Sequence, residues 1–138
     1  SHVTYANRIM PSSIVDGFAS RLQVGSFGVV GTTIFKDKFP TTPSNCVLIR
    51  SDGGAEIVGA PMIPYVVQVL VRNSADRTGQ QLTEAIYSSL SRNGFQVYSG
   101  FQGRCTPRST PGLRYTDENG RFVYSLSFDF TGLATLSS

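Results

Sequence analysis

The sequence predicts an α+β domain: an antiparallel-rich mixed β-sheet with two helices packed on one face, plus long loops. Three patterns support this fold class. Apolar residues alternate strictly from Phe122 to Phe130, which is typical of a half-buried strand in an antiparallel sheet. A second alternating run, Tyr65 to Arg72, carries apolar residues on both faces, as a central strand does. Segments 14–22 and 82–90 repeat apolar residues at helical spacing, and such amphipathic helices pack on one face of a sheet.

The first helix is predicted from Ser13 to about Gln23. Ser13 can cap its amino end, and Ile14, Phe18 and Leu22 form one apolar stripe at four-residue spacing. This stripe is expected to face the sheet.

The stretch from Val24 to Asn45 is rich in Gly, Thr and Pro. It predicts a long loop, with at most a short strand at 29–30 or 34–35. Long ordered loops are commonly functional, and here the loop could reach a neighbouring subunit.

The short apolar run from Cys46 to Arg50 predicts the next strand. A tight turn is expected at Ser51–Gly54, followed by a weak returning strand at Glu56–Val58. Pro61 and Pro64 are expected to keep the next residues out of the centre of a sheet, because proline cannot donate to the strand ladder.

The second helix follows the strand Tyr65–Arg72. Ser74 or Asp76 can cap its amino end, and Gly94 stands where a left-handed residue often ends a helix. Its apolar face is predicted to comprise Leu82, Ala85, Ile86 and Leu90.

The last third of the chain predicts a strand at Phe95–Tyr98 and a second long loop at Ser99–Gly112, which is rich in Gly, Pro and Arg. A short strand at Leu113–Tyr115 then leads into Asp117–Gly120, whose final Asn-Gly pair is a strong hairpin signal. The alternating strand Phe122–Phe130 is expected to pair back on it.

The length of 138 residues predicts one domain, 1–138, with 1–12 as a flexible segment. Charged residues make up 15% of the chain, against about 25% in typical soluble domains. Either subunit contacts or a surface rich in Ser, Thr and Gly would explain this deficit. The net charge of +3 comes from singly spaced arginines, whereas nucleic-acid binders usually show a clustered basic stripe.

The sequence gives no support to an enzyme, and no cofactor, metal or membrane partner is expected. His2 is the only histidine, so a hydrolase triad lacks its usual base. Cys46 and Cys105 cannot complete a zinc site by themselves; a buried thiol is predicted for the first, and a place in a polar loop for the second. The apolar run 63–71 is too short to span a bilayer, and no leader-like pattern is seen at the start.

The aromatic stripe of the last strand has two possible interpretations. Phe122, Tyr124, Phe128 and Phe130, with Arg121 nearby, could stack on single-stranded bases. A stripe at strict strand spacing more often packs against a helix, so a core role is favoured.

Three segments in this order resemble the tail terminator and minor capsid (tail-completion) protein family of long-tailed bacteriophages. They are the strand and glycine turn Ile49–Gly54, the strand Tyr65–Asn73 with the helix Gln81–Leu90, and the turn Asp117–Arg121 leading into Phe122–Phe130. The resemblance covers about residues 46–132 and the first helix. It departs from the family at 94–114, which is longer and more basic.

The resemblance implies a virion structural protein that acts in virion assembly at the tail–head junction, after synthesis in the host cytoplasm. Family members form rings, commonly hexameric, that cap the bacteriophage tail tube and stop its polymerisation. The implied partners are further copies of the chain, the tail tube protein and a head-closure or neck protein, with DNA passing through the lumen without specific binding. Another head–tail joining (connector or neck) component is the alternative, and a non-specific nucleic-acid-binding module is a less supported one.

A head-to-tail ring needs two different matching patches on each subunit. The loops Gly25–Asn45 and Ser99–Gly112 are the expected locations. Arginines and one acid are the candidate interface residues. Those expected to pair with acidic groups of a neighbour, or else to face DNA, are Arg104, Arg108 and Arg114. Those expected to have a structural or interface role are Arg72, Asp117 and Arg121.

Overall fold

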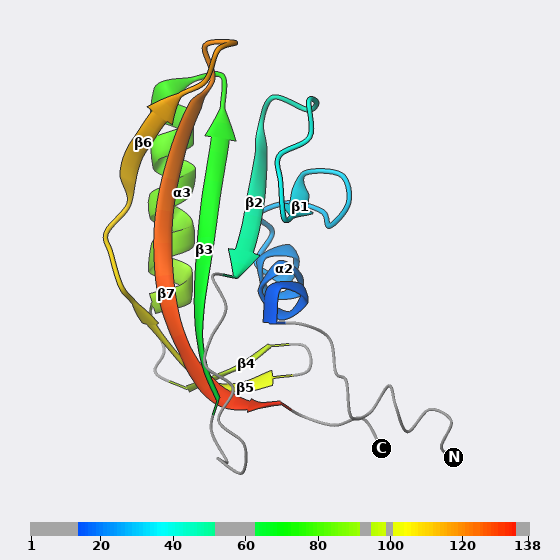
Figure 1. Ribbon diagram of the computed structural model, residues 1–138, viewed down its shortest axis with the longest axis vertical. Coiled ribbons are helices and arrows are strands. Elements are labelled where there is room, and N and C mark those ends of the chain that lie inside the picture. The colour runs from blue at the N-terminus through cyan, green and yellow to red at the C-terminus, as the bar shows by residue number, and fades with distance from the viewer. Residues whose placement is uncertain (1–13, 52–62, 92–94, 99–100, 135–138) are drawn as a thin grey trace.

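The computed structural model describes residues 14–51, 63–91, 95–98 and 101–134, which form two helices and one seven-stranded sheet (Figure 1). The strand order is β1-β2-β3-β7-β5-β4, and β6 pairs with β7 beside the end of β5. Only β1 and β2 are parallel, so the sheet is mixed and rich in antiparallel pairs, which confirms the predicted fold class. In chain order the elements are α2 (Ile14–Val24), β1 (Ile34–Lys36), β2 (Cys46–Ser51), β3 (Ile63–Asn73), α3 (Asp76–Ser91), β4 (Phe95–Tyr98), β5 (Phe101–Pro107), β6 (Gly112–Thr116) and β7 (Phe122–Ala134).

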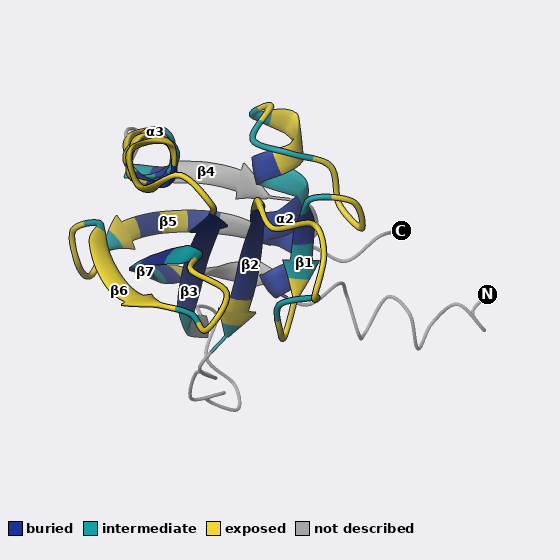
Figure 2. Cartoon of the chain, turned by 90° about the horizontal axis from the view of Figure 1, so that it is seen from above, coloured by how far each residue is buried: buried dark blue, intermediate teal, exposed yellow. Residues whose placement is uncertain are grey.

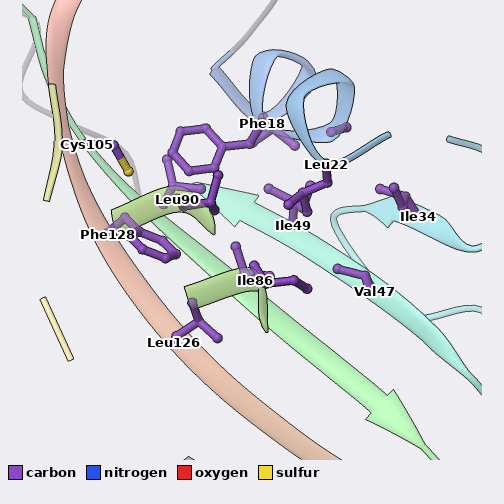
Figure 3. Packing of buried hydrophobic residues seen from close by; sticks show 14 of the residues in the cluster. Phe18, Leu22, Ile34, Val47, Ile49, Ile86, Leu90, Cys105, Leu126 and Phe128 are labelled. Carbon is purple, nitrogen blue, oxygen red and sulfur yellow. The ribbon is translucent and has the colours of Figure 1, made fainter. Parts of the chain in front are cut away.

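Both helices pack on one face of the sheet and enclose the main core (Figures 2 and 3). Phe18 of α2 is fully buried; its ring lies 6.2 Å from that of Phe128 and meets Phe130 edge-on at 5.8 Å. Ile86 and Leu90 of α3 are also fully buried in this core. The aromatic stripe of β7 is therefore core, as favoured above, and is not available to stack on bases.

The helix-free face carries a smaller apolar cluster. Leu48, Leu70 and Val123 are buried there, and Phe35 and Phe39 pack against them. The strands β2, β3 and β7 thus have buried apolar residues on both faces, which the sequence predicted for β3 alone.

The predicted loop Ser99–Gly112 is wrong, because β5 (Phe101–Pro107) pairs with β7 along its whole length. Its inward positions are Gly103 and Cys105, which are buried, while Arg104 and Thr106 are exposed. Glycine and cysteine are weak strand signals, so the alternation was hidden. Cys105 accordingly lies in the core, 3% exposed, and not in a polar loop.

Pro64 lies in β3 and pairs with Thr131 of β7, but outside the described stretch in which β3 also pairs with β2, as expected for a proline. The pairing of β3 with β2 ends at Val67, opposite Ser51. The missing N–H of Pro64 therefore interrupts no bond in the described pairing of β3 with β2.

The buried face of α3 is rotated from the predicted one. Gly79 and Thr83 are buried with Ile86 and Leu90, whereas Ala85 is exposed. The Thr83 hydroxyl donates to the Gly79 carbonyl at 2.7 Å, which satisfies it inside the core. A Cβ on Gly79 would come within 3.1 Å of the Asn73 Cβ, so this glycine permits the close packing of α3.

The backbone amides just before α3 are bonded by asparagine side chains, and not by the predicted caps Ser74 or Asp76. The Ala75 amide donates to Asn73 Oδ1, and the Ser74 amide donates to Asn45 Oδ1, both at 2.9 Å. Several predicted features lie outside the described residues: segment 1–12, Ser13, most of the turn Ser51–Gly54, the strand Glu56–Val58, Pro61 and Gly94.

Candidate assembly surface

Arg72, near the end of β3, holds the proline-rich loop that precedes β2. Its side chain is buried on the helix-free face, with the residue 4% exposed. The guanidinium donates to the carbonyl oxygens of Pro40 (2.6 Å), Pro43 (2.8 Å) and Ser44 (3.1 Å), and it lies 4.7 Å from the centre of the Phe39 ring. Arg72 therefore holds residues 39–44 in one shape, and we call this segment the clamped loop.

The hairpin turn between β6 and β7 is held by Asp117, as its sequence predicted. The carboxylate accepts the backbone amides of Asn119 and Arg121 at 2.9 Å and the Arg121 Nε at 2.8 Å. Gly120 has a φ of 77°, which fits a glycine in this turn. Arg121 also donates to the Thr41 carbonyl at 2.9 Å, so the turn and the proline-rich loop are joined.

These bonds lower the pKa of Asp117. Desolvation acts in the opposite direction and raises the pKa, but hydrogen bonds from the backbone and side chain of Arg121 and from the Asn119 amide outweigh it. The carboxylate is thereby kept charged over a wider pH range.

Two other groups have shifted pKa values for structural reasons. Burial raises the pKa of the Cys46 thiol, although the nearby Arg72 opposes this, so Cys46 is an unreactive core thiol. The hydrogen bond from the Tyr124 hydroxyl to Asp76, followed by burial, raises the pKa of Tyr124 to about 12. This bond ties β7 to the first turn of α3.

The three remaining candidate arginines are exposed and make no hydrogen bond to the loop 39–44 in the described part of the chain. Arg104 projects from β5, and Arg108 forms a half-exposed ion pair with Asp129 at 3.6 Å. Arg114 sits at the bulge in β6, between Leu113 and Tyr115. The structure thus brings Arg72, Asp117 and Arg121 together through the loop 39–44, and leaves the other three at the surface.

Arg114 contributes to a hollow of about 250 Å³ on the helix-free face. The hollow lies between the segment after β1 and strand β6. Its lining is mixed in charge and polarity: Asp37, Lys38, Phe39, Leu48, Arg50, Leu70, Arg114 and Tyr115. With three cations against one acid, it would favour an anionic group.

A set of exposed apolar residues, which the sequence patterns did not predict, lies at two edges of the sheet. At the β1 side these are Val24, Val29 and Val30; at the β6 side they are Leu113 and Tyr115. The first set falls at and just after the end of α2, near the start of the predicted loop arm. Strand alternation alone gave no signal for either set, because exposure here depends on which strands have neighbours.

Neither a metal site nor a membrane span is found in the described part of the chain. No group of three or more His, Cys, Asp or Glu side chains is close enough there to hold a metal ion. None of the helices described is both long and apolar enough to cross a bilayer.

An open sheet with two helices on one face and internally held loops defines a structural α+β module. Residues 21–133 match the family described as bacteriophage tail terminator protein, and the chain belongs to this family of phage structural proteins. A search of curated proteins found no match.

A solved structure described as the virion of a native gene transfer agent particle contains a chain with a similar fold. The TM-score is 0.55 at 13% identity, and the match covers 92% of this chain and 90% of that one. At this identity the likeness concerns the fold alone. The family match over residues 21–133, by contrast, confirms both the family and the tail terminator role that the resemblance implied.

Proposed function

We propose that the chain acts as a homo-oligomeric ring, commonly hexameric in this family, that caps the completed tail tube at the tail–head junction of the virion. The observation that carries the proposal is the family match over residues 21–133. The ring would stop the addition of tube subunits and present a surface to a head-closure or neck protein. Residues 1–138 would act as one domain, made in the host cytoplasm and built into the virion.

The exposed arginines suit contacts with proteins better than with DNA. Arg108 is already paired with Asp129, and Arg104 and Arg114 lie on different strands, so they do not form a continuous basic stripe. We assign Arg104, Arg108 and Arg114 to acidic groups on neighbouring subunits or on the tube. DNA would then pass the lumen without specific binding.

The clamped loop supports the proposal in a second way. Arg72, Asp117 and Arg121 hold the loop 39–44 against the tip of the β6–β7 hairpin through backbone carbonyls. A pre-ordered loop costs less conformational entropy on docking than a mobile one does. These three residues therefore shape an interface without needing to touch the partner.

The proposal is tested by electron microscopy of particles from the source phage with this gene silenced. Overlong or ragged tails are expected, because nothing would stop the tube. Tails of normal length beside unattached full heads would instead show a joining or neck function. Particles like the wild type would refute a role in tail completion.

A further inference from the structure

Strand β6 has an open edge that carries exposed apolar residues. It pairs with β7 on one side, and no described strand lies on the other. Leu113 is 53% exposed and Tyr115 is 44% exposed, opposite Tyr124 and Val123 respectively. Since Tyr124 belongs to the helix-covered core and Val123 to the helix-free cluster, the two side chains flank the edge from both faces. We call Gly112–Thr116 the β6 edge.

Such an edge can pair with a strand of another chain. Natural proteins protect free edges with charges, prolines or covering segments, because unpaired backbone groups can extend the sheet. Within β6 the only charged residue is Arg114, and all five residues are exposed. An edge of this kind needs a partner in the assembled particle.

The second apolar patch lies at the other end of the sheet. Val24 closes α2 and is 78% exposed, while Val29 and Val30 precede β1 and are 53% and 38% exposed. The Val30 amide donates to Gln23 Oε1 at 2.8 Å, which ties these valines to the end of α2. We call Val24, Val29 and Val30 the valine patch.

The two patches face away from each other. In the strand order, β1 ends the sheet on one side and β6 borders it on the other, as Figures 1 and 2 show. Four strand spacings of about 4.8 Å separate β6 from β1, or about 19 Å in all. All five large apolar side chains that are exposed in the described part of the chain belong to one patch or the other.

We infer that the β6 edge of one copy docks on the valine patch of the next copy. A head-to-tail contact requires two different, matching patches on each subunit, and such contacts close into a ring when the rotation permits. One contact between successive copies of a ring would cover both exposed apolar patches of every copy. This inference rests on the proposed ring and names the surfaces that form it.

The pairing is tested in assembled particles with paired cysteines. A phage carrying Leu113→Cys and Val29→Cys in the same chain is purified, treated with a short bismaleimide and run on a denaturing gel. Native Cys46 and Cys105 are each 3% exposed and should not react. A head-to-tail contact links every copy to the next, so a ladder extending beyond the dimer is expected. The single variants Leu113→Cys and Val29→Cys are the matched controls and should stay monomeric, since each then lacks its facing cysteine.

Each other result contradicts the inference in a distinct way. Dimers that form with Leu113→Cys alone would show two β6 edges meeting across a two-fold axis. Particles that contain the double variant and have tails of normal length, but give no ladder, would overturn the inference and leave the terminator proposal intact. Particles that have tails of normal length but lack the protein altogether would overturn both.

Discussion

The buried guanidinium of Arg72 offers a quantitative test of the clamped loop. In Arg72→Met the side chain keeps similar length, but three hydrogen bonds to carbonyls and the contact with the Phe39 ring are lost. Each bond should contribute about 1 kcal/mol, because Pro43 and Ser44 are exposed and water can replace part of it. The cation–π contact adds about 1 kcal/mol. We expect the free energy of unfolding to fall by about 4 kcal/mol.

Urea unfolding followed by circular dichroism measures this loss, and Arg50→Met is the matched control. Arg50 lies on the neighbouring strand, is exposed and donates a hydrogen bond to Gln68 Oε1 at 3.0 Å. Its replacement should cost less than about 1 kcal/mol. Hydrogen exchange in the segment 40–45 should also rise in Arg72→Met alone. Equal losses for the two variants would refute the clamp.

Three further predictions concern the core and two titrating groups. Phe18→Ala should lower the free energy of unfolding by about 3–5 kcal/mol in urea melts, because Phe18 is fully buried. Val24→Ala on the same helix should change it by less than about 0.5 kcal/mol, because Val24 is 78% exposed. The pKa of Asp117 lies below its ordinary value of 3.8, so its stabilising effect is complete above that pH and is lost as the pH falls through the lower folded value. Acid melts of Asp117→Asn should lack this part of the pH dependence, and an unchanged acid profile would contradict the turn's role. Because the pKa of Tyr124 is raised from 10.0 to about 12, stability should fall as the pH rises between those values. An ultraviolet titration should show one of the six tyrosines ionising near pH 12. Asp76→Ala should move that step toward pH 10, because it removes the acceptor of the Tyr124 hydroxyl. Ionisation of all six tyrosines near pH 10 in the wild type would contradict the hydrogen bond between Tyr124 and Asp76.

The elements that were predictable from the sequence are those whose buried face is made of large apolar residues. The helix α2 and the strand β7 follow directly from the spacing of Phe18, Leu22, Phe128 and their neighbours. Strand β5 was missed because its inward residues are Gly103 and Cys105, which pack closely but carry little hydrophobic signal. The buried face of α3 was predicted incorrectly because it includes the polar residue Thr83. The Thr83 hydroxyl can be buried because it donates to the Gly79 carbonyl of its own helix.

The surface features were predictable only in part. The hairpin turn held by Asp117 is local in sequence and was foreseen. The contacts of Arg72 and Arg121 with the loop join residues 28 to 80 positions apart, and no local pattern encodes them. Likewise, the exposure of Leu113 depends on β6 having β7 as its one described neighbour, which is a property of the strand order.

The central claim, that this chain closes the tail tube as a ring, is tested most directly by a cryo-electron microscopy reconstruction of the tail–head junction. We expect one ring of this fold between the tube and the head-closure protein, with the β6 edge of each copy against the valine patch of the next. Finding the fold along the tube, at the distal tip or nowhere in the particle would contradict it.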